Sequence, residues 1–244
     1  MPGPARAMSC AAAYARLRKL ANEQVIRLAE PSTANRVLLD GLGPHTPGII
    51  AGVRLHDTAG APYRPGLLDP RNALALIRFT EFLRDNFGVT ELLLDAGGHC
   101  AALRESHRTG RAIDVAGVVM LVGEVRRRIT VADHWGGVAT AATPGGDWPA
   151  HAGPSLRYRL DEPDAHPLGD PDGDMFVADF FRSVYDFAAG EWQDRSTGPD
   201  PAGPPTAIGE PSLIRHPDHP GCPVAPHRRR RYRTHLHLQI GGTE

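Results

Sequence analysis

The 244-residue sequence lacks several features that would assign it to a common class of protein. It has three cysteines, Cys10, Cys100 and Cys222, which are too few for a disulfide framework. Cys100 and Cys222 either form one bridge or stay reduced, and we expect reduced thiols. A formal net charge of −1 provides no general attraction to nucleic acid or to an anionic membrane surface. We therefore expect no nucleic-acid partner.

Long apolar runs are also missing. No stretch approaches the ~20 consecutive apolar residues that a membrane-spanning helix requires, so we expect no membrane span. The first residues contain no basic segment followed by an apolar core. We therefore expect no signal peptide, and synthesis in the cytoplasm.

Glycine and proline, in contrast, are abundant. The 27 glycines and 23 prolines exceed average usage, which predicts that much of the chain is loop. A hydrophobic content of 41% is sufficient for a core, and the length fits one domain with an appendage. We expect a helical segment over residues 1–35 and one domain over residues 36–244. Loop insertions are expected at about 136–173 and 191–226.

Caps and apolar periodicity predict two long helices. One begins at the Asp69-Pro70 pair, runs to about Asn86 and ends at Gly88. The other covers residues 175–189 and also has one apolar face. With the predicted strands, these helices indicate an α+β fold in which helices flank a small, mostly antiparallel sheet. The other predicted elements are a helix over 10–30, strands over 36–39, 49–56 and 91–95, and a hairpin of 115–121 with 128–131.

Residues 234–239 predict a strand whose polar face carries two histidines. Leucines alternate with His235 and His237, and successive side chains of a strand point to opposite faces. Alternate residues lie roughly 6–7 Å apart along a strand. This spacing lets one imidazole bind a metal ion while the other reaches a group bound to that ion.

A second polar stretch, over residues 106–114, supplies a third histidine and a carboxylate. A turn at Thr109-Gly110 would bring His107 back toward Asp114. Two histidines and one carboxylate leave one tetrahedral position open to water, which is typical of a catalytic zinc site. Separately, a His-x-His pair is more often solvated and Asp114 could be a turn acceptor. The combination is much more specific.

The motif H-x-x-G-x-A-x-D, followed far downstream by H-x-H, resembles a zinc peptidase superfamily. That superfamily includes D-alanyl-D-alanine carboxypeptidases, lysostaphin-type endopeptidases and the hedgehog signalling domain. The sequence is most similar to the extensin-like C-terminal family, over roughly residues 69–239. The resemblance implies that His107, Asp114 and His237 bind Zn²⁺. It also implies that His235 is the unligated catalytic histidine, which accepts a proton or stabilises an oxyanion.

The sequence departs from this family at two positions. The family's serine lies two residues before the first histidine, where this chain has Glu105, and the adjacent residue is Ser106. The carboxypeptidase branch has an acidic general base three residues before its last ligand, where this chain has Thr234. The departures leave the metal ligands in place and change the groups expected to transfer protons.

The resemblance implies a zinc metallopeptidase, either a carboxypeptidase or an endopeptidase, that hydrolyses D-Ala-containing peptides of peptidoglycan in the cell wall. Without a signal peptide, such an enzyme would be released by lysis, be delivered by a phage-like contractile injection particle, or act on another peptide inside the cell. The alternative is a non-hydrolytic zinc-binding module that serves assembly or recognition, for example in a phage-tail-like particle. Thr234 in place of an acid favours this alternative.

Three further features leave alternatives open. Trp135 either lines a substrate groove or covers the rim of the core. The cationic run at 228–231 is either a solvated edge or a binding site for a carboxylate or phosphate group. A histidine-rich passage could hold a second zinc ion, but its many prolines argue against a preformed site. Its candidate ligands are His216, His219, Cys222 and His227.

Overall fold

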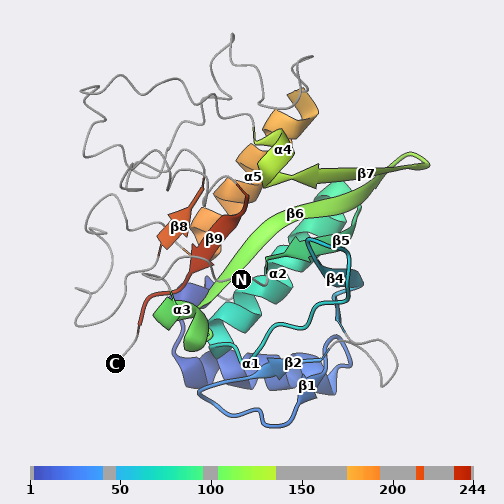
Figure 1. The fold of residues 1–244 in the computed structure, drawn as a ribbon. Coiled ribbons are helices and arrows are strands. Elements are labelled where there is room, and N and C mark those ends of the chain that lie inside the picture. Colours follow the sequence, from blue (N-terminus) through green and yellow to red (C-terminus); the bar gives the residue numbers. More distant parts are fainter. Residues whose placement is uncertain are drawn as a thin grey trace, which may run out of the picture.

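The computed structural model describes residues 3–40, 48–95, 104–135, 175–192, 213–216 and 234–242. These residues form an open seven-stranded sheet and a separate two-stranded ribbon (Figure 1). The strand order is β3-β4-β5-β6-β9-β8, and β7 also pairs with β6. The β4–β5 pair is parallel, whereas the other described pairs are antiparallel. The predicted α+β fold with a mostly antiparallel sheet is confirmed.

The sheet and ribbon alternate with five helices in the described part of the chain. The strands are β1 (Leu28–Ala29), β2 (Leu38–Leu39), β3 (Ile49–Ile50), β4 (Val53–Asp57), β5 (Val89–Leu94), β6 (Ala112–Val122), β7 (Val125–Thr130), β8 (Leu213–Arg215) and β9 (Leu236–Gln239). The helices are α1 (Cys10–Asn22), α2 (Pro70–Phe87), α3 (Arg104–Arg108), α4 (Val131–His134) and α5 (Met175–Glu191), and a 3₁₀ turn covers Ala5–Ala7.

Helix α2 has the two ends that the sequence predicts. The Asp69 side chain accepts a hydrogen bond from the Arg71 backbone N–H, and Gly88 ends the helix in the left-handed conformation at φ 64°. Glycine has no Cβ and therefore adopts this conformation without steric cost. On the buried face of α2, the Phe79 ring lies 5.8 Å from the rings of both Phe187 and Trp192, at the C-terminal end of α5. Helices α2 and α5 thus pack together and cover one face of the sheet (Figure 1).

The two faces of the sheet differ in character. Ile113 and Val115 of β6 and Leu236 and Leu238 of β9 belong to the hydrophobic core beneath α2 and α5. Alternation along each strand sends the intervening side chains to the opposite face. We call this opposite face the site face, because Asp114 of β6 and His237 of β9 project from it.

The N-terminal segment differs from the prediction of one helix over 10–30. Helix α1 ends at Asn22 because Gln24 adopts a positive φ of 60°, which a right-handed helix does not accommodate. The next residues form β1 and pair with β2. Ala13 and Leu17 of α1 are fully buried in the core next to α2, so this helix belongs to the domain rather than to a partner interface.

Two other predictions need correction. The strand predicted over 49–56 is a hairpin of β3 and β4, because Ala51 and Gly52 have positive φ values of 50° and 83° and reverse the chain. The passage predicted as a loop over 191–226 contains β8, which pairs with β9. Helix α5 also extends to Glu191, beyond the predicted end.

Some predictions fall outside the described residues. They concern the loop over 136–173, Cys100, Cys222, His219, His227 and the cationic run at 228–231.

Where helices are described, none combines the length and apolar character needed to span a bilayer.

Candidate metal site

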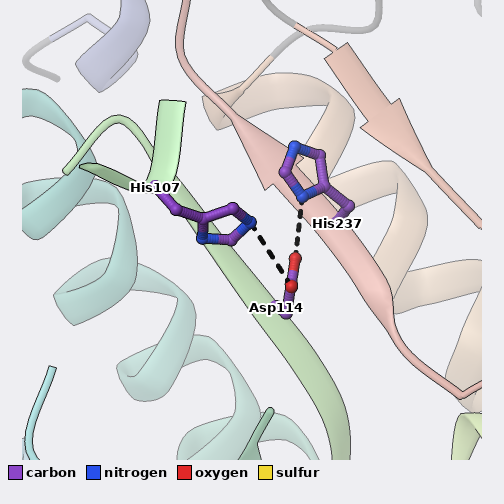
Figure 2. A group of neighbouring side chains, drawn as sticks. All are labelled: His107, Asp114 and His237. Carbon is purple, nitrogen blue, oxygen red and sulfur yellow. Dashed lines mark hydrogen bonds and ion pairs between the residues drawn. The ribbon is translucent and has the colours of Figure 1, made fainter. Parts of the chain in front are cut away.

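Three residues from three elements meet on the site face. His107 lies near the end of α3, Asp114 lies in β6 and His237 lies in β9 (Figure 2). Asp114 and His237 are direct partners in the β6–β9 register. Asp114 Oδ1 is 2.7 Å from His237 Nδ1, and Asp114 Oδ2 is 3.4 Å from His107 Nε2. One ligand atom from each residue lies within 4.8 Å of the other two, so this group could hold a metal ion.

The turn at Gly110 places His107 beside Asp114. Gly110 has φ 72°, and its N–H donates to the His107 carbonyl oxygen. A Cβ at this position would overlap the Leu67 carbonyl oxygen, so the close approach of the two chain segments requires glycine. The Gly110 carbonyl accepts hydrogen bonds from the Asp69 backbone N–H and the Asn72 side chain. The predicted turn is confirmed, and these bonds fix it to the start of α2.

Asp114 is a buried carboxylate surrounded by imidazoles. Its side chain is 2% exposed. Burial alone would raise the pKa of Asp114, but hydrogen bonds with His107 and His237 outweigh burial and hold this pKa well below its ordinary value. Within the described residues, the basic side chains within 4 Å of the Asp114 carboxylate are three histidines, with no arginine or lysine among them. A buried charge of this kind needs a compensating cation.

The two ring nitrogens of His237 both face oxygen atoms. Nδ1 lies 2.7 Å from Asp114 Oδ1, and Nε2 lies 3.0 Å from the fully buried Gln239 Oε1. A neutral imidazole has one N–H, so it can donate to only one of these oxygens. If Nε2–H donates to Gln239, then Nδ1 has a lone pair available for a metal ion. Orientation of a ligating histidine by a hydrogen bond to its other nitrogen is typical of metal sites.

The donor set therefore fits Zn²⁺. Two imidazole nitrogens and one carboxylate oxygen are common zinc ligands, and three protein ligands leave one position open. Two of the three residues, His107 and Asp114, also line a pocket, which is described below.

His235 lies beside this group rather than in it. Its Nε2 is 3.7 Å from Asp114 Oδ2, and its Nδ1 is 3.5 Å from Asp95 Oδ2. The Thr234 hydroxyl lies 3.1 Å from the same Nδ1. Burial lowers the pKa of His235 more than Asp114 and Asp95 raise it, so this imidazole is neutral at neutral pH. A neutral imidazole can accept a proton.

Asp95 is a site residue that the sequence interpretation missed. It directly follows β5, its backbone N–H donates to the Asp114 carbonyl oxygen, and its side chain is 16% exposed. The available signal was a charged residue at the end of the apolar run E-L-L-L-D. Thr234 has no acidic group, and Asp95, at the end of β5, places one near His235.

A pocket of about 340 Å³ opens beside the metal ligands. Its lining includes His107, Asp114 and Asp95, together with Arg36 and Tyr63. Arg36 and Tyr63 precede α2, so they lie far before the metal motifs in the sequence. Local sequence patterns gave no reason to connect them with the site.

His216, a candidate ligand of a second metal site, is buried, and the other three candidate ligands lie outside the described residues. The His216 ring stacks on Trp135 at 5.3 Å and contacts the edge of Tyr185 at 5.6 Å. His216 is 2% exposed and Trp135 is 3% exposed. Trp135 therefore covers the core instead of lining the pocket.

Comparisons with known proteins leave the family unassigned: no family model, no curated protein and no solved structure matches this chain.

Proposed function

We propose that the protein is a zinc-dependent metallopeptidase that hydrolyses D-Ala-containing peptides of the peptidoglycan type. The observation that carries this proposal is the group of His107, Asp114 and His237 beside an open pocket. These residues would hold Zn²⁺, which polarises a carbonyl group and lowers the pKa of its bound water to about 7.

His235 would accept the proton in this reaction, and Asp95 would assist His235. His235 is buried and neutral, and it lies next to a metal ligand without belonging to the three-ligand group. Asp95 faces His235 Nδ1 at 3.5 Å, so the carboxylate can orient the imidazole and stabilise the imidazolium that forms after proton uptake. This acidic group favours an enzyme over the non-hydrolytic zinc-binding module that Thr234 suggested.

The substrate class rests on the resemblance of the two motifs to zinc peptidases of the cell wall. Two properties of the pocket support a small peptide. Its volume of about 340 Å³ falls within the range of small-ligand sites. Arg36 and Arg108 in its lining provide positive charge for a peptide carboxylate.

The direct test combines metal analysis with hydrolysis of purified peptidoglycan fragments. We expect one equivalent of zinc per chain and release of shorter peptides or of D-Ala. A chelator should abolish the reaction, and added zinc should restore it. If the zinc-loaded protein leaves all such peptides intact, the non-hydrolytic zinc-binding module becomes the better assignment.

A further inference from the structure

The Tyr63 side chain lies in the pocket beside the metal ligands. Its backbone N–H donates to the Leu55 carbonyl oxygen at 2.9 Å, which fixes the loop after β4. Tyr63 lines the same pocket as His107, Asp95 and Asp114, and it packs partly buried against the core. The hydroxyl group makes no hydrogen bond with any part of the chain that the structure describes. A polar group in this position is available to a ligand.

The Tyr63 hydroxyl has the properties of a hydrogen-bond donor rather than a base. A phenol has an ordinary pKa of about 10, and burial raises the pKa of Tyr63. The hydroxyl therefore keeps its proton at neutral pH and can donate a hydrogen bond.

The other polar groups of the pocket have different roles. Arg36 Nη2 already donates to the carbonyl oxygens of Leu67 and Arg108, at 2.8 Å and 2.9 Å. Asp95 is an acceptor that faces His235. A peptide carbonyl that reacts at the metal site gains negative charge on its oxygen and is stabilised by a donor positioned nearby.

We propose that the Tyr63 hydroxyl donates a hydrogen bond to the substrate oxygen that is activated at the metal site. Tyr63 would thus contact the substrate, and its hydrogen bond would strengthen as charge develops on that oxygen. This inference rests on the proposed peptidase function and assigns one further residue to the same site.

Tyr63→Phe tests the proposal because it keeps the ring and removes only the hydroxyl. Tyr14→Phe is the matched control: its hydroxyl, outside the pocket lining, donates to the Ser32 carbonyl oxygen. Both variants should retain the wild-type zinc content and fold. Tyr14→Phe loses one hydrogen bond, so its thermal midpoint should fall by no more than a few degrees. For Tyr63→Phe we expect kcat to fall roughly 10²- to 10³-fold, which is typical for loss of an oxyanion donor, with little change in KM. Tyr14→Phe should match the wild type.

A binding measurement provides a second readout that does not require turnover. Acetohydroxamate binds zinc through oxygen atoms, and its affinity for the zinc-loaded protein can be measured by titration calorimetry. Loss of a hydrogen bond to a charged oxygen should weaken its binding by about tenfold or more in Tyr63→Phe. Tyr14→Phe should bind it as the wild type does.

The two readouts separate this inference from the proposed function. If the wild type cleaves peptides and Tyr63→Phe has unchanged kcat, the inference is overturned while the peptidase function stands. If the wild type cleaves no peptide but Tyr63→Phe binds acetohydroxamate more weakly, the peptidase function fails and the donor role of Tyr63 stands. Equal acetohydroxamate affinity in all three proteins, or none in the wild type, overturns the inference.

Discussion

The site face of the sheet carries two histidine–carboxylate clusters that differ in how their charge is balanced. In the first, Glu91 lies 3.0 Å from His56 and 2.6 Å from the guanidinium of Arg126. In the second, Asp114 is surrounded by imidazoles, as described above. The first cluster contains its own permanent cation, since arginine remains charged at all ordinary pH values. Among the described residues the second cluster has no arginine or lysine, and it is the cluster whose donor atoms could hold a metal ion.

The largest expected effect is loss of zinc from the second cluster alone. Asp114→Ala removes the carboxylate that both ligand histidines face, and two remaining ligands hold zinc weakly. We expect elemental analysis after gel filtration to find little zinc in Asp114→Ala or His107→Ala. Glu91→Ala, which disrupts the first cluster, should retain one equivalent.

A full equivalent of zinc in His107→Ala would show that the ligand assignment is wrong. Loss of zinc from Glu91→Ala would show that the two clusters are not independent.

The next largest effect compares a histidine from each cluster. His235→Ala should retain zinc, because the three ligands remain, and should retain its fold. Hydrolysis should fall roughly 10²- to 10⁴-fold, which is typical for removal of a positioned general acid or base. His56→Ala should hydrolyse peptides at the wild-type rate. Steady-state kinetics on a peptidoglycan peptide measure both variants.

A wild-type rate in His235→Ala would mean that another group transfers the proton, and Asp95 would then be the first residue to test.

A smaller effect is expected from Gln239, which supports only the second cluster. Its side-chain oxygen orients His237 through Nε2. Loss of such a supporting hydrogen bond typically weakens metal affinity by about 10- to 100-fold. Competition with a chromophoric chelator should therefore show weaker zinc binding by Gln239→Ala, without a change in stoichiometry. Unchanged affinity would indicate that His237 is oriented by its strand alone.

The sequence predicts those parts of the site that depend on residues close together in the chain. The alternation of leucines with His235 and His237 determines which side chains share a face of β9 and of the residue before it. The Gly110 turn likewise follows from a short motif. Helix α2 was predicted with both ends because its capping residues act within one turn of the helix.

The features that the sequence did not predict depend mainly on pairing between strands that are far apart in the chain. Asp95 and Tyr63 come near Asp114 only because β4, β5 and β6 are neighbours in the sheet. Strand β8 has three residues, too few for a visible alternation, and it is stabilised by pairing with β9. Helix α1 was predicted too long because apolar residues beyond Asn22 continue the pattern, while the backbone turns at Gln24. The spacing of apolar residues does not reveal such a change in backbone direction.

The smallest effect comes from removing the cation of the first cluster. The Arg126 side chain is 63% exposed, so solvent screens its attraction to Glu91. Exposed ion pairs typically contribute about 0–1 kcal/mol to the free energy of unfolding. A loss of about 1 kcal/mol lowers the thermal midpoint of a domain of this size by roughly 2–4 °C. For Arg126→Ala we therefore expect a decrease of up to about this size in calorimetry.

The zinc content of Arg126→Ala sharpens the comparison further. Without Arg126, Glu91 resembles Asp114 in being a largely buried carboxylate that faces a histidine, but only His56 and Glu91 remain as ligands there. If metal binding requires three converging ligands, the variant should still contain one equivalent of zinc. A second equivalent would show that an uncompensated buried carboxylate with a single histidine is enough to bind the ion. In that case the geometry around Asp114 would no longer distinguish the second cluster as the candidate metal site.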